Sequence, residues 1–359
     1  MYQDEYRDSR TTKSTETLFS VVPVGTCTYR HMSDDDVFHM NINTLEKGLV
    51  SREYPVFEAS KGNNLEFLVQ HINSSEEFKA FCAEQKKGGT RTRLYYNTLC
   101  QFTVRVPALK EQAQISQCLK KLDTLITLHQ RKCDKLIQFK AAMLKKMFPQ
   151  NGADKPELRF KGFTDAWEQR KLGELIEITS VKRIHQSDWT DSGVRFLRAR
   201  DIVAVSKNEE VSEPLFISQE KYDEYSALSG KVKIGDLLVT GVGTIGVPML
   251  INNEEPLYFK DGNIIWFKNE DRIDGEFFYH SFNGSFIQNF IKESAGIGTV
   301  GTYTIESGKK TPILLPTQKD EQQKIGTFFS QLDTLITLHQ RKCDKYKSIK
   351  AGLIRKFFP

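Results

Sequence analysis

The stretch "LDTLITLHQRKCDK" occupies residues 122–135, and the same fourteen letters return at residues 332–345. Two identical segments of this length do not arise by chance, and a repeated core segment indicates a repeated structural unit. Apolar residues recur within the segment at steps of three and four, which is the spacing of an α-helix. The chain is therefore predicted to contain one helix twice, 210 residues apart.

The repeat continues on both sides at the same offset. Downstream, "KKMFP" ending at Pro149 matches "RKFFP" ending at Pro359, and upstream "EQ" at 111–112 matches "EQ" at 321–322. Further upstream the identity fades, but "VGTCTYR" at 24–30 lies opposite "IGDLLVT" at 234–240, and "YPVFEAS" at 54–60 lies opposite "IIWFKNE" at 264–270. Residues 24–149 thus align with 234–359 without a net gap.

The second copy also has a front part, roughly residues 157–233, which begins "ELRFKGFTDAWEQRKLGEL". The first copy has only 23 residues in that place. Either the first unit is naturally shorter, or the chain begins inside a longer ancestral unit. We expect the second, so that the first domain is N-terminally shortened and exposes apolar surface where part of its core is lost.

Composition and cysteine usage limit the class of protein. Of the 359 residues 39% are hydrophobic and 27% charged, which is typical of a globular protein. No apolar run approaches the roughly 20 residues needed to span a bilayer, and the polar N-terminus does not resemble a secretory signal. Six cysteines form neither a CxxC pair nor a zinc-like pattern with histidine. We therefore expect a reduced, cytoplasmic protein with neither a membrane span nor a bound metal.

The basic charge is concentrated in the repeated segments. Net charge is +5, yet residues 110–147 carry nine Lys and Arg against three acids, and residues 319–358 carry nine against four. The remainder of the chain is therefore net acidic. This basic charge forms either a solvated helix face or a surface that meets a polyanion, and the two remain alternatives here.

Each repeated segment is predicted to be one long helix, over 110–147 and over 319–358. Neither Pro nor Gly interrupts the first, and at about 1.5 Å per residue it would be about 57 Å long. Two equivalent apolar stripes in one chain can bury each other as an antiparallel coiled coil, because a whole domain connects the helices. The two histidines on the apolar side could bind a metal, but a core role that sets the register is expected. The predicted interface between the helices, or with a partner, comprises Leu122, Leu125, Ile126, His129, Leu332, Leu335, Ile336 and His339.

The segments before each helix contain short β-like runs with turn signals, such as "KIGDLLVTG" and "GVPMLINN". The expected fold class is therefore α+β, with two globular domains that alternate with two long helices. The expected boundaries are 1–107 for a shortened first domain, 108–149 for the central helix, 150–316 for the second domain and 317–359 for the C-terminal helix.

Two glycine-rich segments invite a cofactor interpretation. "GVGTIG" at 241–246 and "GIGTVG" at 296–301 both fit GxGxxG, and Asp261 lies about 20 residues beyond the first. A dinucleotide site needs a helix directly after the glycines, whereas "VPMLINNEEP" and "TYTIESGKK" follow them. The first-copy equivalents, residues 31–36 and 86–91, lack this GxGxxG pattern, as expected of loops that vary on a fixed frame. With no Walker, GxSxG or HExxH motif either, no catalytic residue and no cofactor of this chain's own are expected.

Clusters of basic residues in the globular parts form either solvated surface or DNA contacts. Lys and Arg contact phosphates and base edges, with Ser and Thr as hydrogen-bonding partners. The predicted DNA-binding residues of the second domain are Lys182, Arg183, His185, Arg198, Arg200 and, on turns next to β-like runs, Thr240, Thr244 and Lys309. Those of the first domain are Lys86, Lys87, Arg91 and Arg93.

The repeated motifs resemble a known family. "LDTLITLHQRK", its lead-in "PTQKDEQQKIGTFFSQLD", the "KKMFP" and "RKFFP" endings and "LRFKGFTDAWEQRKLGEL" are similar to the DNA-specificity subunit of type I restriction-modification systems. The resemblance covers residues 24–359. It implies two target-recognition domains, each reading one half of a bipartite site in double-stranded DNA, and two antiparallel helices that set the spacing.

The resemblance also implies partners. The helices would dock two methyltransferase subunits, restriction subunits would join the complex, and S-adenosylmethionine, ATP and Mg would be held by those partners, so this subunit would not be catalytic. The chain departs from the family in one respect, because nothing at 1–23 matches "LRF…WEQRKLGEL". A truncated variant that acts as a self-associating half-subunit, a coiled-coil assembly protein without a DNA role and a dinucleotide oxidoreductase are the alternatives.

Overall fold

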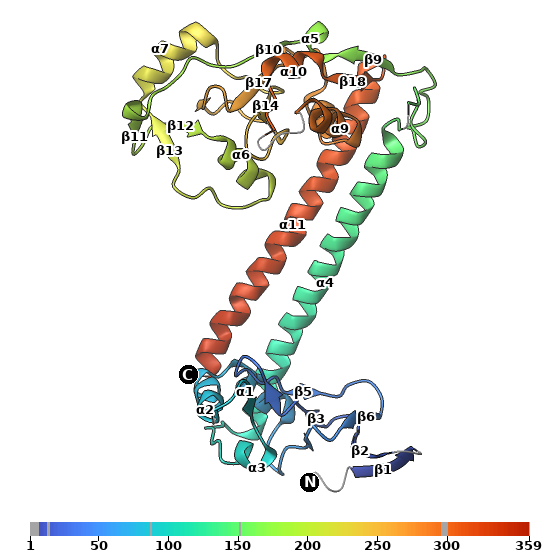
Figure 1. The fold of residues 1–359 in the computed structure, drawn as a ribbon, viewed down its shortest axis with the longest axis vertical. Coiled ribbons are helices and arrows are strands. Elements are labelled where there is room, and N and C mark those ends of the chain that lie inside the picture. Colours follow the sequence, from blue (N-terminus) through green and yellow to red (C-terminus); the bar gives the residue numbers. More distant parts are fainter. Residues whose placement is uncertain (1–6, 13–14, 87, 151, 296–300, 359) are drawn as a thin grey trace. The chain divides into compact units, whose positions relative to one another are not determined.

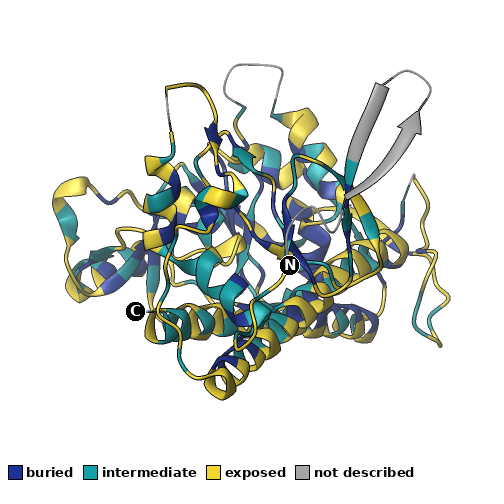
Figure 2. Ribbon diagram, turned by 90° about the horizontal axis from the view of Figure 1, so that it is seen from below, coloured by how far each residue is buried: buried dark blue, intermediate teal, exposed yellow. Residues whose placement is uncertain are grey.

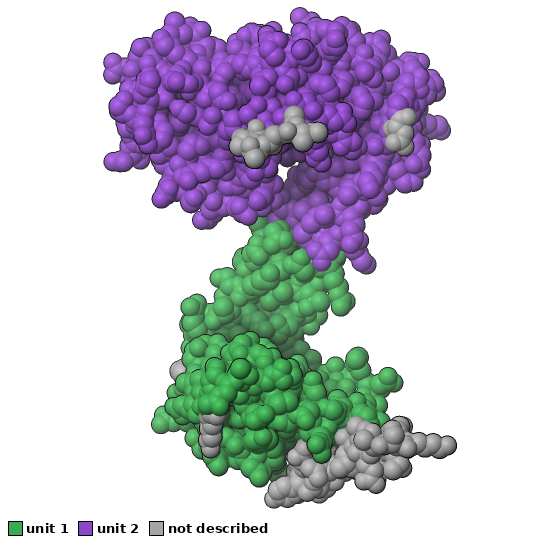
Figure 3. Space-filling model, viewed as in Figure 1, with its two compact units in different colours: residues 1–131, 339–359 green, residues 132–338 purple. Residues whose placement is uncertain are grey.

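The computed structural model describes residues 7–12, 15–86, 88–150, 152–295 and 301–358. Figure 3 shows how these residues divide into two compact units, residues 1–131 with 339–359 and residues 132–338. The division cuts both long helices, so that each unit contains part of each. Among the described residues no helix is long and apolar enough to cross a membrane.

The two predicted helices are present almost to the residue. α4 spans Leu109–Met147 and α11 spans Lys319–Phe357. Both have acidic residues in the first turn and basic residues in the last turn, which suits the helix dipole. α4 ends just before Pro149, whose ring cannot continue a helix. In Figure 2 exposed positions interleave with intermediate and buried ones along both helices, as the sequence periodicity predicts.

The helices pack side by side and run antiparallel (Figure 1). In the first unit, Lys350 Nζ lies 2.5 Å from Asp123 Oδ1, and the Cys343 thiol lies 3.9 Å from the Ile126 carbonyl. His129 Nδ1 and His339 Nδ1 are 2.8 Å apart, so one ring donates and the other accepts. As residue numbers fall on α11 they rise on α4, and the predicted antiparallel pairing is confirmed.

The second unit repeats these contacts with the roles of the helices exchanged. Lys140 Nζ lies 2.5 Å from Asp333 Oδ1, and the Cys133 thiol lies 4.0 Å from the Ile336 carbonyl. Each contact is the other unit's contact moved by 210 residues. The identical sequence is therefore used twice in the same local environment. Along each helix, the histidine of the His129–His339 pair lies between the two sets of contacts.

The globular part of the first unit has a small sheet ordered β5-β3-β7, a separate sheet β1-β2-β6 and a short ladder β4-β8. Its core includes Cys27, Tyr29, Phe38 and Phe78. The elements are β1 (Arg7–Thr12), β2 (Thr15–Val22), β3 (Cys27–Thr28), β4 (Met32–Ser33), β5 (Asn41–Ile42), β6 (Gly48–Ser51), β7 (Val56–Phe57), α1 (Leu65–Ser74), α2 (Glu76–Glu84), β8 (Thr92–Arg93) and α3 (Tyr96–Leu99).

The globular part of the second unit has two four-stranded sheets, β10-β17-β14-β15 and β11-β13-β12-β16, and a two-stranded ladder β18-β9. Its strands are β9 (Glu168–Lys171), β10 (Glu177–Thr179), β11 (Trp189–Thr190), β12 (Val194–Leu197), β13 (Leu215–Ile217), β14 (Leu237–Thr240), β15 (Pro248–Leu250), β16 (Leu257–Phe259), β17 (Ile264–Lys268) and β18 (Pro312–Leu315). Its helices are α5 (Leu172–Leu175), η2 (Gln186–Asp188), α6 (Ala199–Ser206), α7 (Gln219–Ser229), α8 (Gly275–Phe282), α9 (Ser285–Ser294) and α10 (Ile305–Lys310).

The strand register confirms the alignment of the two copies. Cys27 pairs with Phe57 in the first unit, and Leu237 pairs with Phe267 in the second, both shifted by 210. The helix starts agree as well, because Asn64 caps α1 through the Phe67 N–H and Asp274 caps α8 through the Phe277 N–H. The first unit is thus built on the same core as the second. The sheet β11-β13-β12-β16 belongs to residues 189–259, most of which precede this shared core.

Candidate nucleic-acid interface

In the first unit two loops with candidate residues meet at one end of the core sheet. The loop after β3 and the segment before α3 pair as β4 and β8. Arg91 Nε lies 2.7 Å from Asp34 Oδ1, and Lys86 Nζ lies 3.3 Å from Asp36. These side chains are about half exposed, so the ion pairs are weak and a phosphate could take the place of the carboxylates.

Hydrogen bonds favour the charged form of two acidic residues of this loop, Asp35 and Asp36. Thr92 donates a hydrogen bond to Asp36, which lowers the pKa of that carboxyl, and Ser33 does the same to the pKa of Asp35. The loop borders a hollow of about 430 Å³ lined by Arg30, Asp34 and Tyr54, among others. Of the other predicted contacts, Arg93 is exposed and Lys87 lies outside the described residues. Among the described residues, Arg93 has no acidic partner.

The second unit brings two loops together at the equivalent end of its sheet. The Gly241 N–H donates to the Asn263 carbonyl, and the Gly241 carbonyl accepts from the Tyr303 N–H at 2.9 Å. Thr240 is fully buried and braces the loop: its hydroxyl donates to the Thr244 carbonyl at 2.5 Å and accepts from the Val247 N–H. Thr240 therefore holds the loop's shape, whereas Thr244 is exposed at its tip.

The glycine loop has no dinucleotide geometry. β15, and not a helix, directly follows Gly246, so the loop lacks the strand–glycine–helix order of a dinucleotide site. Gly243 and Gly246 have φ of +69° and +75°, which explains the glycines as turn residues. Most of the second glycine segment lies outside the described residues. Lys309 was expected on a turn; instead it lies in α10, where its ammonium is 2.8 Å from Glu306 and lowers the pKa of that carboxyl.

The basic cluster at 182–185 lies in the loop between β10 and η2, directly before the sheet β11-β13-β12-β16, which we call the extra sheet. Arg183 Nε is 2.8 Å from Asp261 Oδ2, and this contact raises the pKa of the guanidinium. Arg183 remains two-thirds exposed. Lys182 lies over the Tyr225 ring, with Nζ 5.2 Å from the centroid, and His185 caps the short helix η2. Lys182, Arg183 and His185 are all exposed, as phosphate contacts require.

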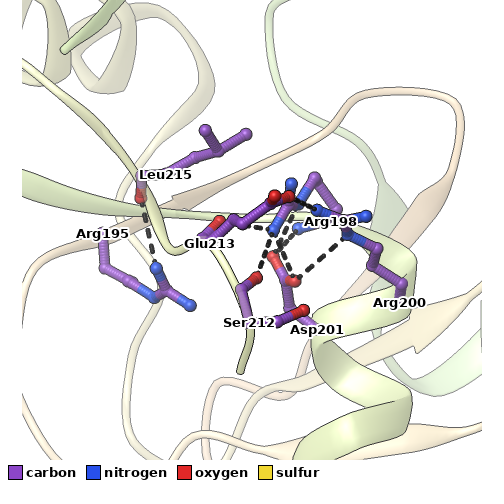
Figure 4. A network of polar contacts seen from close by, with 7 residues as sticks. All are labelled: Arg195, Arg198, Arg200, Asp201, Ser212, Glu213 and Leu215. Atoms are coloured by element: carbon purple, nitrogen blue, oxygen red, sulfur yellow. Dashed lines mark hydrogen bonds and ion pairs between the residues drawn. The ribbon is translucent and has the colours of Figure 1, made fainter. Parts of the chain in front are cut away.

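Arg198 and Arg200 differ in environment although they are two residues apart (Figure 4). The Arg198 guanidinium donates to both oxygens of Asp201 and to the carbonyls of Ser212 and Glu213. Asp201 is 1% exposed and Arg198 18% exposed. Arg200 is 56% exposed, and its contacts are one of 3.2 Å to the exposed Glu213 and a longer one of 3.9 Å from Nε to Asp201 Oδ1. Arg200 is thus available to a ligand, whereas Arg198 fastens the start of α6 to the segment before β13.

One further residue joins the candidates. Arg30 is exposed beside the hollow of the first unit and is the counterpart of Thr240 at the 210-residue offset. The sequence repeat contained this signal, because Thr240 was already a candidate.

The predicted interface residues of the long helices fall into two groups. Leu332 and His129 are buried, and Leu122, Ile126, Ile336 and His339 are partly buried where the helices meet. Leu335 is 43% exposed, and its counterpart Leu125 is partly buried. Leu335 therefore faces outward and is available to a partner.

Comparison with known families decides the relationship. A model described as the type I restriction modification DNA specificity domain matches residues 39–138 and 164–347, which is most of the chain. The chain belongs to this family. The two matched segments correspond to the two structural copies, so the specificity domain occurs twice.

Two curated specificity subunits are similar to the chain. A type I restriction enzyme specificity subunit of Methanocaldococcus jannaschii is 26% identical over 294 residues, which is 77% of this chain and 66% of that protein. A protein of Haemophilus influenzae named as a type I specificity subunit is 28% identical over 167 residues, which is 46% of this chain and 40% of that protein. The chain thus spans just under two thirds of the first relative and less of the second.

Two solved structures share the fold. The type I restriction-modification S subunit from M. genitalium has a TM-score of 0.61 at 14% identity, covering 94% of this chain and 84% of that one. A chain from a study of complex assembly and conformational transition of the type I system has a TM-score of 0.50 at 16% identity, covering 94% and 83%. The arrangement of helices and sheets in this chain is therefore the specificity-subunit fold.

Proposed function

We propose that this member of the specificity-subunit family is a non-catalytic DNA-binding subunit that reads a bipartite site within a type I restriction-modification complex. The observation that carries the proposal is the repeated loop pair. Loops at the same end of the same sheet differ in sequence between the units while the sheet register and helix caps are preserved. Variable loops on a constant frame are the expected form of two recognition surfaces for different half-sites.

The contacts proposed for DNA are the exposed basic and hydroxyl groups near these loops. Within the first domain, residues 1–107, they are Arg30, Lys86, Arg91 and Arg93. Within the second, residues 150–316, they are Lys182, Arg183, His185, Arg200 and Thr244. Both loop regions are only modestly basic, so the affinity of the isolated subunit for DNA is expected to be weak and strongly dependent on salt.

The helical segments, 108–149 and 317–359, are proposed to dock two methyltransferase subunits, with restriction subunits joining the complex. Because the helix pair repeats its contacts with the two helices exchanged, it presents two similar surfaces, one to each copy of a single partner. S-adenosylmethionine, ATP and Mg are proposed to bind to the partners, and the complex is proposed to be cytoplasmic.

Sequencing of the methylome tests the proposal. The chain is co-expressed with a matching methyltransferase subunit in a host without DNA methylation, and modified adenines are mapped. An asymmetric bipartite motif supports reading by both units. A palindromic motif means that two chains associate and only the second unit reads, and an assembled complex that modifies no motif overturns the DNA-reading proposal.

A further inference from the structure

In the second unit, residues 154–171 pack against the end of α4 and the start of α11. We call this segment the clasp. Arg159 forms two hydrogen bonds with Glu321, Nε to Oε1 at 2.6 Å and Nη2 to Oε2 at 2.8 Å. The two side chains are 12% and 1% exposed, so this is a largely buried bidentate ion pair. The Arg159 contact therefore fixes the front of the clasp to the first turn of α11.

The rest of the clasp is held by aromatic packing and strand pairing. Trp167 is buried edge-on against Phe148 and Phe277, with ring centroids 5.9 and 5.7 Å away. Phe160 packs against Phe328 at 6.3 Å. Directly after Trp167, β9 pairs antiparallel with β18. The clasp thus has three attachments: the Arg159–Glu321 ion pair, the buried Trp167 side chain and the pairing of β9 with β18.

The surface that receives the clasp is repeated in the first unit. Phe358 and Phe67 pack at 5.3 Å, as their counterparts Phe148 and Phe277 pack at 5.5 Å. Glu111 occupies the place of Glu321 in the first turn of α4. The adjacent glutamine repeats its bonds as well, because Gln112 accepts from the Asn64 N–H and Gln322 accepts from the Asp274 N–H.

The strand that would pair with a clasp is also present. Gln112 donates to the Pro107 carbonyl as Gln322 donates to the Pro316 carbonyl, so Pro107 corresponds to Pro316. Residues 103–106 therefore correspond to β18, with the offset reduced to 209 in this short stretch. They precede α4 as β18 precedes α11.

Within the part of the chain that the structure describes, no segment occupies this surface. Residues 103–106 pair with no strand, and Glu111 is exposed with no cationic partner. Val106 and Leu109 are 40% and 49% exposed. No tryptophan reaches Phe358; the His71 ring stacks on it at 4.6 Å instead, with a buried Nδ1 that has no hydrogen-bond partner.

We propose that this surface of the first unit binds a clasp-like segment of a separate polypeptide. The chemistry of that segment follows from the receiving groups. An arginine would pair with the Glu111 carboxylate, a tryptophan eight residues later would displace His71 from Phe358, and the following residues would add a strand to 103–106. The chain's own clasp is held by the second unit, so it does not serve both. The proposal is independent of DNA binding.

A labelled peptide of residues 154–172 tests the proposal by fluorescence anisotropy with the full-length chain. We expect saturable binding of one peptide per chain. The peptide with Arg159→Glu should bind at least about tenfold more weakly, because two carboxylates then face each other. Protein carrying Glu111→Arg should reject the original peptide and recover affinity for the reversed one, whereas Glu76→Arg, an exposed site on α2, should change neither.

Hydrogen exchange gives a second readout. Bound peptide should protect the backbone of residues 103–106, because a new strand would take their free hydrogen-bonding groups. Absence of saturation at millimolar peptide overturns the proposal. Peptide affinity that is unchanged by Glu111→Arg overturns it as well. So does binding that protects other segments and not 103–106. Because Glu111 is exposed, the thermal melt of the Glu111→Arg variant should match that of the original chain.

Discussion

At the scale of single residues, Arg198 and Arg200 separate a structural role from a binding role. Arg198→Ala would leave the buried Asp201 carboxylate without its guanidinium, and we expect a loss of about 2 kcal/mol in the free energy of unfolding. Arg200→Ala, at an exposed position, should change stability by less than about 0.5 kcal/mol. Urea unfolding of the two variants is the measurement. Equal stability of both would show that the Arg198 network does not support the fold.

His280 makes the second unit sensitive to acid. Burial lowers the pKa of its imidazole from 6.5 to about 3, and neither ring nitrogen has a hydrogen-bond partner among the described residues. The carboxylates of Glu276 and Asp333 lie 3.7 Å from Nε2, beyond hydrogen-bonding distance, and Asp333 is already paired with Lys140. Burial therefore outweighs their attraction for a charged ring.

The sign of the pH dependence follows. The unfolded chain takes up a proton at His280 near pH 6.5 and the folded chain does not, so stability falls as pH is lowered from 6.5 towards 3. A difference of one in pKa between the folded and unfolded chain corresponds to about 1.4 kcal/mol of stability. The equivalent position in the first copy, position 70, is a glutamine. His280→Gln should therefore be tolerated and should make the loss of stability between pH 7 and pH 4 smaller by a few kcal/mol at most. Unfolding measured at pH 7 and pH 4 tests this, and an unchanged slope would contradict it.

The residue scale is also where prediction from sequence was least complete. The sequence identified basic residues, but the state of each depends on neighbours that spacing does not reveal. Arg198 binds carbonyls fourteen and fifteen residues away, and Arg183 binds Asp261. Lys309 was expected on a turn and is in a helix. The DNA contacts stay predictions, with Arg200 favoured over Arg198 by exposure.

At the scale of elements, prediction was close, because long helices and a repeated frame are encoded by many residues at once. The bounds expected for the helices differ from the observed ones by a single residue at one end of each. The alignment of 24–30 with 234–240 agrees with the equivalent pairings of Cys27 with Phe57 and of Leu237 with Phe267, although the pairings themselves were not predicted. The short strands of the extra sheet were not anticipated individually, since they have two to four residues each.

The helix pair offers a test that separates folding from docking. Leu335 is 43% exposed and Leu332, three residues earlier on the same helix, is 7% exposed. Leu332→Asp should destabilise the chain by more than about 3 kcal/mol, because it buries an unpaired charge. Leu335→Asp should leave the thermal melt nearly unchanged and weaken assembly with a methyltransferase subunit, an effect that Leu125→Asp should increase. If the Leu335→Asp, Leu125→Asp double variant assembles as well as the wild-type chain, these leucines are not part of the proposed docking surface.

At the scale of the whole molecule, the chain completes each core with the end of a long helix. Met147 and Phe148, at the end of α4, pack into the core of the second unit. Phe357 and Phe358, at the end of α11, pack with Phe67 of the first unit. Each core is therefore finished by residues distant in sequence from its sheet. The core of the first unit is therefore complete only when residues beyond 350 pack against it.

The internal repeat makes each unit a control for the other. Phe148 is buried against Trp167, Phe277 and Phe329, so Phe148→Ala should cost about 3–4 kcal/mol. Phe358 is only partly buried, against Phe67 and His71, and Phe358→Ala should cost about 1–2 kcal/mol because less surface loses contact.

Hydrogen exchange of α8 and α1 reports the two units separately. Phe148→Ala should speed exchange in α8 and not in α1, and Phe358→Ala should do the reverse, because each ring contacts one unit only. Equal acceleration in both helices would mean that the chain opens as one cooperative body. In that case the helix pair would couple the two units in stability, and a loop change in one unit would be expected to alter the binding of both.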